Sequence, residues 1–235
     1  MSELLYEGKA KQVYATEDPN VVMVHYKDDA TAQNGLKKGT IVGKGVINNR
    51  MSNAMFRMLE EKGIPTHYIK ELNDRDTLVK HVKIVPLEVI VRNIAAGSLA
   101  ERLGVEEGTK MDSTVLEFCY KDDALGDPIV NEYHIRAIHL ATDEEVRIIS
   151  DMALKINKLL KAHMAAAHMV LVDFKLEFGR TPDGQILLAD EISPDTCRLW
   201  DDATGEKLDK DRFRRDLGKT EEAYQEVMRR LGLDQ

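Results

Sequence analysis

The chain has 235 residues, of which 43% are hydrophobic and 31% are charged, and this composition is typical of a folded globular protein. A formal net charge of −8, with no block of basic residues, argues against nucleic acid as the main partner. No apolar run is long enough to span a bilayer, the first residues lack an apolar signal core, and Cys119 and Cys197 are the only cysteines. We therefore expect a cytoplasmic protein with no membrane partner and no disulfide framework.

The first residues predict an antiparallel meander of three short strands, over 4–7, 12–15 and 21–26. The first turn contains Gly8, Lys9 and Lys11, whose backbone N–H groups and ammonium charges could cover a polyphosphate. On these residues alone a simple surface turn is the preferred interpretation, because Gly-Lys turns are common on surfaces and this one lacks the Gly-Lys-Ser/Thr ending of a P-loop.

A boundary between two lobes is predicted at residues 83–88. Before it, the pattern indicates a polar loop, an amphipathic helix and two strands, over 27–40, 42–62, 67–69 and 78–85. Pro86 ends the last strand, and a new β-branched strand covers 87–91. The chain is therefore expected to divide into a β-rich N-terminal lobe, 1–85, and a larger α/β lobe, 86–235.

A candidate anion site follows the boundary. Ser98 and Glu101 fit a capping box at the start of a short helix that Gly104 closes, and Arg92 ends the preceding strand. A helix N-terminus with a serine beside an arginine can bind an anion. The alternative is a plain cap, with Arg92 in a structural ion pair.

The most informative stretch is a predicted hairpin, in which strands at 171–179 and around 187–190 are joined by a turn at 181–184. Asp173, Lys175 and Glu177 alternate along the first strand and so share one face. The hairpin brings Asp190 near Glu177, which gives an oxygen-ligand site suited to Mg²⁺ carrying nucleotide phosphates. A solvated sheet face with ion pairs is the alternative.

The remaining segments predict a strand, a long loop, a helix that opens with a capping box and a last amphipathic helix, over 115–120, 121–132, 142–167 and 220–231. Cys197 has no histidine in its own stretch, so we interpret it as a small apolar side chain and not as a nucleophile.

Two long segments, 84–98 and 171–179, resemble the signature segments of the SAICAR synthetase family of de novo purine synthesis. Shorter segments that also resemble this family are 8–14, 121–123, 190–195, 198–201 and 209–214. The resemblance covers essentially the whole chain. It implies an α+β, ATP-grasp-like architecture of two lobes, with antiparallel sheets, flanking helices and the nucleotide in the cleft between the lobes.

The resemblance also implies the reaction and its partners. ATP would phosphorylate the carboxylate of 5-amino-1-(5-phospho-D-ribosyl)imidazole-4-carboxylate, and L-aspartate would displace phosphate from the acyl phosphate to give SAICAR. Mg²⁺ is the implied cofactor, and a homo-oligomer is expected, with a dimer as the first expectation. Two alternatives stay open at this point: another ATP-grasp carboxylate–amine ligase, and a nucleotide-binding module without catalysis.

Site residues are carried over by position in the matching motifs. The phosphates and adenine of ATP are assigned to Lys9, Lys11, Lys121 and the backbone near Ile84, and the metal to Glu177 and Asp190. The phosphate of the ribonucleotide is assigned to Arg92, Ser98 and Arg198. The reacting groups are assigned to Asp173, Lys175 and Asp195.

Overall fold

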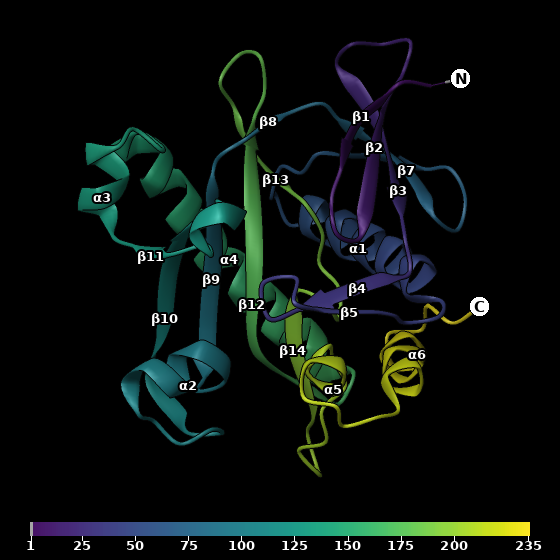
Figure 1. The fold of residues 1–235 in the computed structure, drawn as a ribbon, viewed down its shortest axis with the longest axis vertical. Helices are drawn as coiled ribbons and strands as arrows, with labels where there is room; N and C mark the ends of the chain where they lie inside the picture. The colour runs from purple at the N-terminus through teal and green to yellow at the C-terminus, as the bar shows by residue number, and fades with distance from the viewer. Residues whose placement is uncertain (1) are drawn as a thin grey trace.

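A computed structural model describes residues 2–235 and shows an α+β protein with two large antiparallel sheets, a small hairpin and flanking helices (Figure 1). The first sheet has the strand order β1-β2-β3-β7-β6. Its strands are β1 (Leu4–Glu7), β2 (Lys11–Ala15), β3 (Val21–Tyr26), β6 (Tyr68–Glu71) and β7 (Asp76–Lys80). The predicted meander is confirmed, and the alternate residues Val22, Val24 and Tyr26 of β3 face a small core of their own.

The second sheet is built around β12 (Met169–Arg180), the long central strand of Figure 1. Its path runs β11-β10-β9-β12-β13, and β8 and β14 also pair with β12. The other strands of this sheet are β8 (Lys83–Ile84), β9 (Leu87–Ile94), β10 (Lys110–Tyr120), β11 (Ile129–Val130), β13 (Ile186–Ala189) and β14 (Cys197–Asp201). The predicted hairpin is confirmed, with Glu177 opposite Ala189, so that Asp190 follows directly after the paired strand.

The predicted single strand over 78–85 is wrong, because the chain changes sheets inside it. β7 pairs with β3 in the first sheet, whereas β8 pairs with β12 in the second. The backbone N–H of His81 bonds to Asn20, and Val82 packs so closely on Gly179 that an added Cβ would lie 2.3 Å from its side chain. A glycine on β12 therefore permits the crossover.

The expected loop over 27–40 is also wrong, since β4 (Asp29–Ala32) and β5 (Lys37–Thr40) form a two-stranded hairpin. Gln33, Asn34 and Gly35 at its tip all have positive φ, which reverses the chain. The strands are short and contain few β-branched residues, so the period-2 signal is absent from the sequence.

Helices cover the second sheet and connect it to the first. They are α1 (Lys44–Glu61), α2 (Gly97–Leu103), α3 (Glu132–Ala137), α4 (Asp143–Ala166), α5 (Asp211–Arg214) and α6 (Thr220–Arg230), with a 3₁₀ turn, η1, at Asp123–Leu125. Met51 and Leu59 of α1 and Ile156 and Leu160 of α4 lie fully buried in one core with β9 and β12. Each such side chain stabilises the fold by roughly 1.5–3 kcal/mol. None of the helices within residues 2–235 is long and apolar enough to cross a membrane.

The predicted helix signals had mixed outcomes. The capping box of Thr142 and Glu145 is confirmed at the start of α4. Ser98 is not a cap: the N-cap of α2 is Ala96, and no side chain caps that helix. Within the predicted long loop, Asn131 and His134 form a capping box that starts α3, which the sequence analysis missed.

Candidate active site

The carboxylates of Glu177 on β12 and Asp190 after β13 meet at the ammonium of Lys175. Lys175 Nζ lies 2.9 Å from Glu177 Oε1 and 3.3 Å from Asp190 Oδ2. Asp190 has a φ of 56°, a left-handed conformation that turns the chain away from the strand directly after the hairpin. The period-2 spacing of β12 and the hairpin register thus produce the cluster that the sequence predicted.

Two further lysines reach this cluster from distant segments. Lys11 of β2 contacts Asp190 and lies 3.2 Å from Glu191, and Lys121, after β10, lies 3.0 Å from Glu177. Burial raises the pKa of Asp190, but the charges of Lys11 and Lys175 outweigh burial and hold it well below its usual range. The carboxylates of Glu177 and Asp190 therefore belong to one cluster, in which the ammonium groups of Lys11, Lys121 and Lys175 contact them.

A cavity of about 330 Å³ opens beside the carboxylates, between the first sheet and the hairpin. Its walls are largely apolar, from Leu5, Val13, Val22, Val24, Val79 and Ile84. Its polar end contains Lys11, Lys121, Glu177 and Asp190. An apolar slot with a charged end suits a flat heteroaromatic base joined to phosphates. Of the residues predicted to bind nucleotide, all except Lys9 line this cavity.

His67 also lines the nucleotide-sized cavity, and the sequence analysis did not single it out. Burial, with a contribution from the charge of Lys11, lowers the pKa of His67 to about 3. The imidazole is therefore neutral at physiological pH, and it packs edge-on against Phe56 of α1.

A second cavity of about 280 Å³ contains Asp173, Lys175, Asp195 and Arg198 among its lining residues, and Lys9 lies at it as well. Lys9 is half-exposed and lies 3.5 Å from Asp123 of η1. Because Lys175 lines this cavity while its ammonium contacts Glu177 and Asp190 of the first one, the two cavities meet at Lys175.

The residues predicted to bind the ribonucleotide phosphate converge, although they come from separate segments. Arg92 Nη1 and Arg198 Nη1 lie 3.0 and 3.1 Å from the same oxygen of Asp173, and Arg92 Nη2 donates to Ser98 Oγ at 3.0 Å. Arg92 is only 3% exposed, and its Nε binds Glu117 at 2.9 Å. Arg92 is thus fully engaged by protein groups in the structure.

Gly97, at the start of α2, makes room for Arg198. Its φ is 52°, and an added Cβ would lie 2.5 Å from Arg198 Nη2. A side chain at this position would displace the guanidinium and strain the backbone. The first turn of α2 and Arg198 therefore lie in direct contact.

Asp195 is fixed by α1 and α6 together. Lys44, which is fully buried, and Asn48 of α1 donate to one of its oxygens, and the hydroxyl of Tyr224 of α6 donates to the other. Burial raises the pKa of Asp195, but Lys44 and Lys210 outweigh that effect and keep the carboxyl well below its usual range. None of these partners was predicted from the sequence, because each lies far from Asp195 along the chain.

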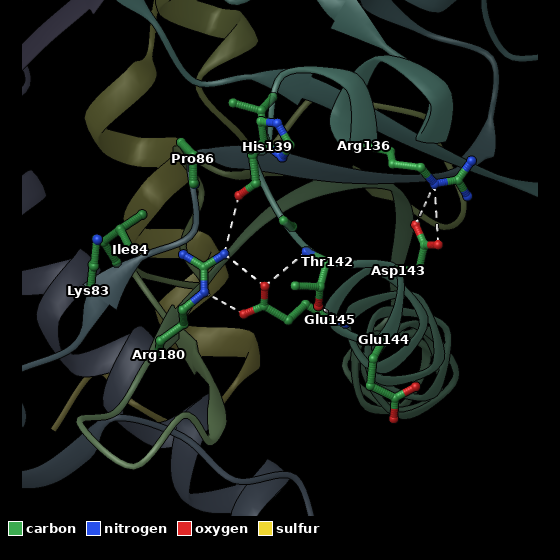
Figure 2. Close-up of a pocket in the computed structure, with 12 residues that line it drawn as sticks. Lys83, Ile84, Pro86, Arg136, His139, Thr142, Asp143, Glu144, Glu145 and Arg180 are labelled. Carbon is green, nitrogen blue, oxygen red and sulfur yellow. Dashed lines mark hydrogen bonds and ion pairs between the residues drawn. The ribbon is translucent and has the colours of Figure 1, made fainter.

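A surface hollow of about 950 Å³ lies elsewhere, at the start of α4. Figure 2 shows that four of its charged side chains form two ion pairs: Arg180 pairs with Glu145, and Arg136 Nε lies 2.9 Å from Asp143. Of the predicted site residues, only Ile84 lines it. We place the chemistry in the two smaller cavities, because carboxylates and lysines converge there and the pKa values of Lys11, Lys175, Asp190 and Asp195 are shifted from their usual ranges.

Comparison with known proteins identifies the family. A sequence profile described as SAICAR synthetase matches residues 4–231. The chain belongs to the SAICAR synthetase family. A phosphoribosylaminoimidazole-succinocarboxamide synthase from Coprothermobacter proteolyticus is 60% identical over 230 residues, which cover 98% of each chain. One from Lachnoclostridium phytofermentans is 62% identical, over 99% of this chain and 98% of the relative. Proteins of this family are ligases, and so is this chain.

Solved SAICAR synthetases share the fold. The enzyme from Ehrlichia chaffeensis matches with a TM-score of 0.96 at 46% identity, over 98% of this chain and 99% of the other. A SAICAR synthetase solved in complex with ADP matches with a TM-score of 0.94 at 45% identity, over 97% of both chains. The resemblance stated from the sequence motifs is therefore confirmed.

Proposed function

We propose that this chain uses ATP to join L-aspartate to the carboxylate of 5-amino-1-(5-phospho-D-ribosyl)imidazole-4-carboxylate, giving SAICAR, ADP and phosphate in purine biosynthesis. Membership of the SAICAR synthetase family supports the reaction. The observation that carries the proposal is the pair of cavities that meet at Lys175, since a ligase of this kind must place a nucleotide and a carboxylate side by side.

The nucleotide lies in the 330 Å³ cavity in this proposal, with adenine near Ile84 and the phosphates directed to Lys11 and Lys121. Lys9 acts from the neighbouring cavity, over the end of the phosphate chain. The proposal includes an ATP-grasp-like arrangement, in which the lobe of residues 1–85 covers the nucleotide and residues 86–235 hold the substrate and metal. The mixed lining of the cavity, with Val22 from the first sheet and Glu177 from the second, supports this arrangement.

Glu177 and Asp190 fit a site for Mg²⁺. Within the described chain, no group of three or more His, Cys, Asp or Glu side chains could hold a metal ion alone. Mg²⁺ commonly takes one or two carboxylates and completes its shell with water and substrate phosphates, so this donor set is the expected one. The Lys175 ammonium already contacts both carboxylates, which marks the place as favourable for positive charge. When bound, the metal would neutralise charge on the nucleotide phosphates.

The chemistry requires a carboxylate, a poor electrophile, to be activated. An oxygen of the ribonucleotide carboxylate attacks the γ-phosphorus, ADP leaves, and an acyl phosphate forms. The amine of aspartate then attacks the acyl carbon, loses a proton, and expels phosphate as the amide bond forms. Lys175 stabilises the charge on the transferring phosphoryl group, and Asp173 and Asp195 flank the imidazole substrate from the other walls of the cavity.

The phosphate of the ribonucleotide is assigned to Arg92, Ser98 and Arg198. Arg198 supports this assignment best, because it lies in the second cavity and also touches the start of α2, where backbone N–H groups favour an anion. Arg92 contributes through Ser98 and Asp173, both of which it binds directly.

An assay of ADP release tests the proposed function. Purified protein with Mg²⁺-ATP and the ribonucleotide is expected to release ADP rapidly with L-aspartate and far more slowly with L-glutamate or glycine. Equal rates with all three amino acids would contradict the assignment of the co-substrate. A cytoplasmic location and a homodimeric state are further predictions. Light scattering of the protein as it elutes from a size-exclusion column measures its molar mass and so tests the homodimer.

A further inference from the structure

Lys210 is a cation of the second cavity for which residues 2–235 provide no carboxylate within 4.0 Å. It precedes α5 and lines the cavity together with Asp195 and Glu191. The other lysines that line this cavity are paired, Lys9 with Asp123 and Lys175 with Glu177 and Asp190. Nearby, Lys11 pairs with Asp190, Lys44 with Asp195 and Lys121 with Glu177. The cavity arginines are also occupied, since Arg198 binds Asp173 and Asp211, and Arg214 binds Asp211.

Partial burial makes the absence of a directly paired carboxylate unfavourable for the Lys210 ammonium. Partial burial is the main cause that lowers the pKa of Lys210 to about 8; the charges of Arg214 and Lys44 act in the same direction, against those of Asp195 and Glu191. Lys210 is half-buried, and a partly buried ammonium that no carboxylate contacts directly is destabilising unless a ligand supplies the negative charge. The unpaired cation thus indicates a place where an anionic group of a substrate binds.

The surrounding charges indicate which substrate this is. Asp29, Glu191 and Asp195 also line the cavity, and such carboxylates oppose a phosphate dianion but suit the ammonium of an amino acid. Arg198, the cation assigned to the phosphate, instead reaches toward Gly97 at the start of α2. A cavity with both a free cation and several acids matches an α-amino acid, which carries both signs.

We propose that Lys210 binds a carboxylate of the amino-acid co-substrate and so helps to select L-aspartate. This inference rests on the proposed function, because it assumes that the second cavity receives both the ribonucleotide and the amino acid. The ammonium of Lys210 donates to the carboxylate, while the acids near it orient the amine toward the acyl carbon.

Kinetics of Lys210→Gln and Lys210→Met test the proposal. The KM for L-aspartate is expected to rise at least about tenfold, as for the loss of a charge-assisted contact, with the KM values for ATP and the ribonucleotide nearly unchanged. Lys210→Arg should recover part of the loss. The melting temperature of Lys210→Met should fall less than that of Lys44→Met, because Asp195 keeps its direct contact with Lys44.

Lys207→Gln is the matched control. Lys207 lies three residues earlier, pairs with Glu107 at 3.5 Å and does not line the cavity, so its kinetics should equal those of the wild type. An unchanged KM for aspartate in Lys210→Gln, or a rise in the KM of the ribonucleotide that equals or exceeds it, would overturn the inference. A wild-type protein without aspartate-dependent ADP release would instead contradict the proposed function itself.

Discussion

The ammonium of Lys175 lies 2.9 Å from a carboxylate oxygen of Glu177, two residues further along the same strand. Because alternate residues of a strand share a face, this contact needs no distant element and follows from the local sequence. The hairpin then adds Asp190 to the same ammonium. One short segment thus supplies both proposed metal ligands and the lysine at the junction of the two cavities.

Glu177→Gln and Asp190→Asn should each lower turnover at least about a hundredfold, because a neutral amide cannot replace a carboxylate beside Mg²⁺ and phosphate. Asp190→Asn should also lower the melting temperature, since Asp190 pairs with both Lys11 and Lys175. Steady-state kinetics across a Mg²⁺ titration make the measurement. Near-normal activity of both variants at ordinary Mg²⁺ would remove the metal assignment.

Lys11→Ala should raise the KM for ATP or lower kcat, because Lys11 provides positive charge at the polar end of the nucleotide cavity. Hydrogen exchange of residues 7–12 provides an independent measurement. Binding of an ATP analogue with Mg²⁺ should protect these amides in the wild type, and unchanged exchange would support a simple surface turn.

Arg92→Lys should weaken ribonucleotide binding by about 1.5–3 kcal/mol, because a single ammonium cannot contact Glu117, Asp173 and Ser98 as the guanidinium does. The melting temperature should also fall, since Arg92 forms buried ion pairs. The affinities for ATP and for the ribonucleotide show whether Arg92 binds the phosphate or only stabilises the fold. A lower affinity for the ribonucleotide alone indicates the phosphate site, whereas an equal loss of affinity for ATP would indicate a purely structural residue.

Lys44→Met should destabilise the protein by roughly 3–5 kcal/mol, because it leaves the buried carboxylate of Asp195 without its cation. Urea unfolding measures this loss. Lys38→Met, at an exposed position of the β4–β5 hairpin, is the control and should unfold like the wild type. A Lys44→Met variant as stable as this control would show that Asp195 does not depend on Lys44.

Asp28 should make stability depend on acid pH. Burial raises its pKa, but Arg75 and the backbone N–H groups of Gly45 and Gly43 outweigh burial and lower it to about 2. Because this value lies below the unfolded value of 3.8, the stabilisation is present above about pH 4 and is lost as the pH falls toward 2. After allowance for solvent screening, we expect the free energy of unfolding, measured with urea, to fall by roughly 1–2 kcal/mol over this pH range. In Asp28→Asn this fall should be smaller, because the titrating carboxyl is absent.

The sequence predicted the elements that local patterns determine. The β12–β13 hairpin has alternating residues and a Pro-Asp-Gly turn, and α4 has a capping box and a long apolar stripe, so both were found. The β4–β5 hairpin was missed because its tip relies on positive φ at Gln33 and Asn34, which residue type alone indicates weakly.

The site was predictable where its residues lie on one hairpin and not where they meet across the fold. Ser98 was predicted as a cap from its spacing to Glu101, but its hydroxyl accepts from Arg92 instead. The partners of Asp195 lie on α1 and α6, and no local pattern connects those helices to it. Lys210 differs from the paired lysines only in what surrounds it, and this depends on tertiary structure.

Isotope transfer tests the central claim most directly. The ribonucleotide is prepared with ¹⁸O in its carboxylate, and one turnover is run with Mg²⁺-ATP and L-aspartate. If the carboxylate is phosphorylated and the amine then expels phosphate, the released phosphate carries one ¹⁸O from the substrate, and the product is the aspartyl amide. Unlabelled phosphate released alongside the amide would contradict the acyl phosphate and with it the proposed role of the two adjoining cavities.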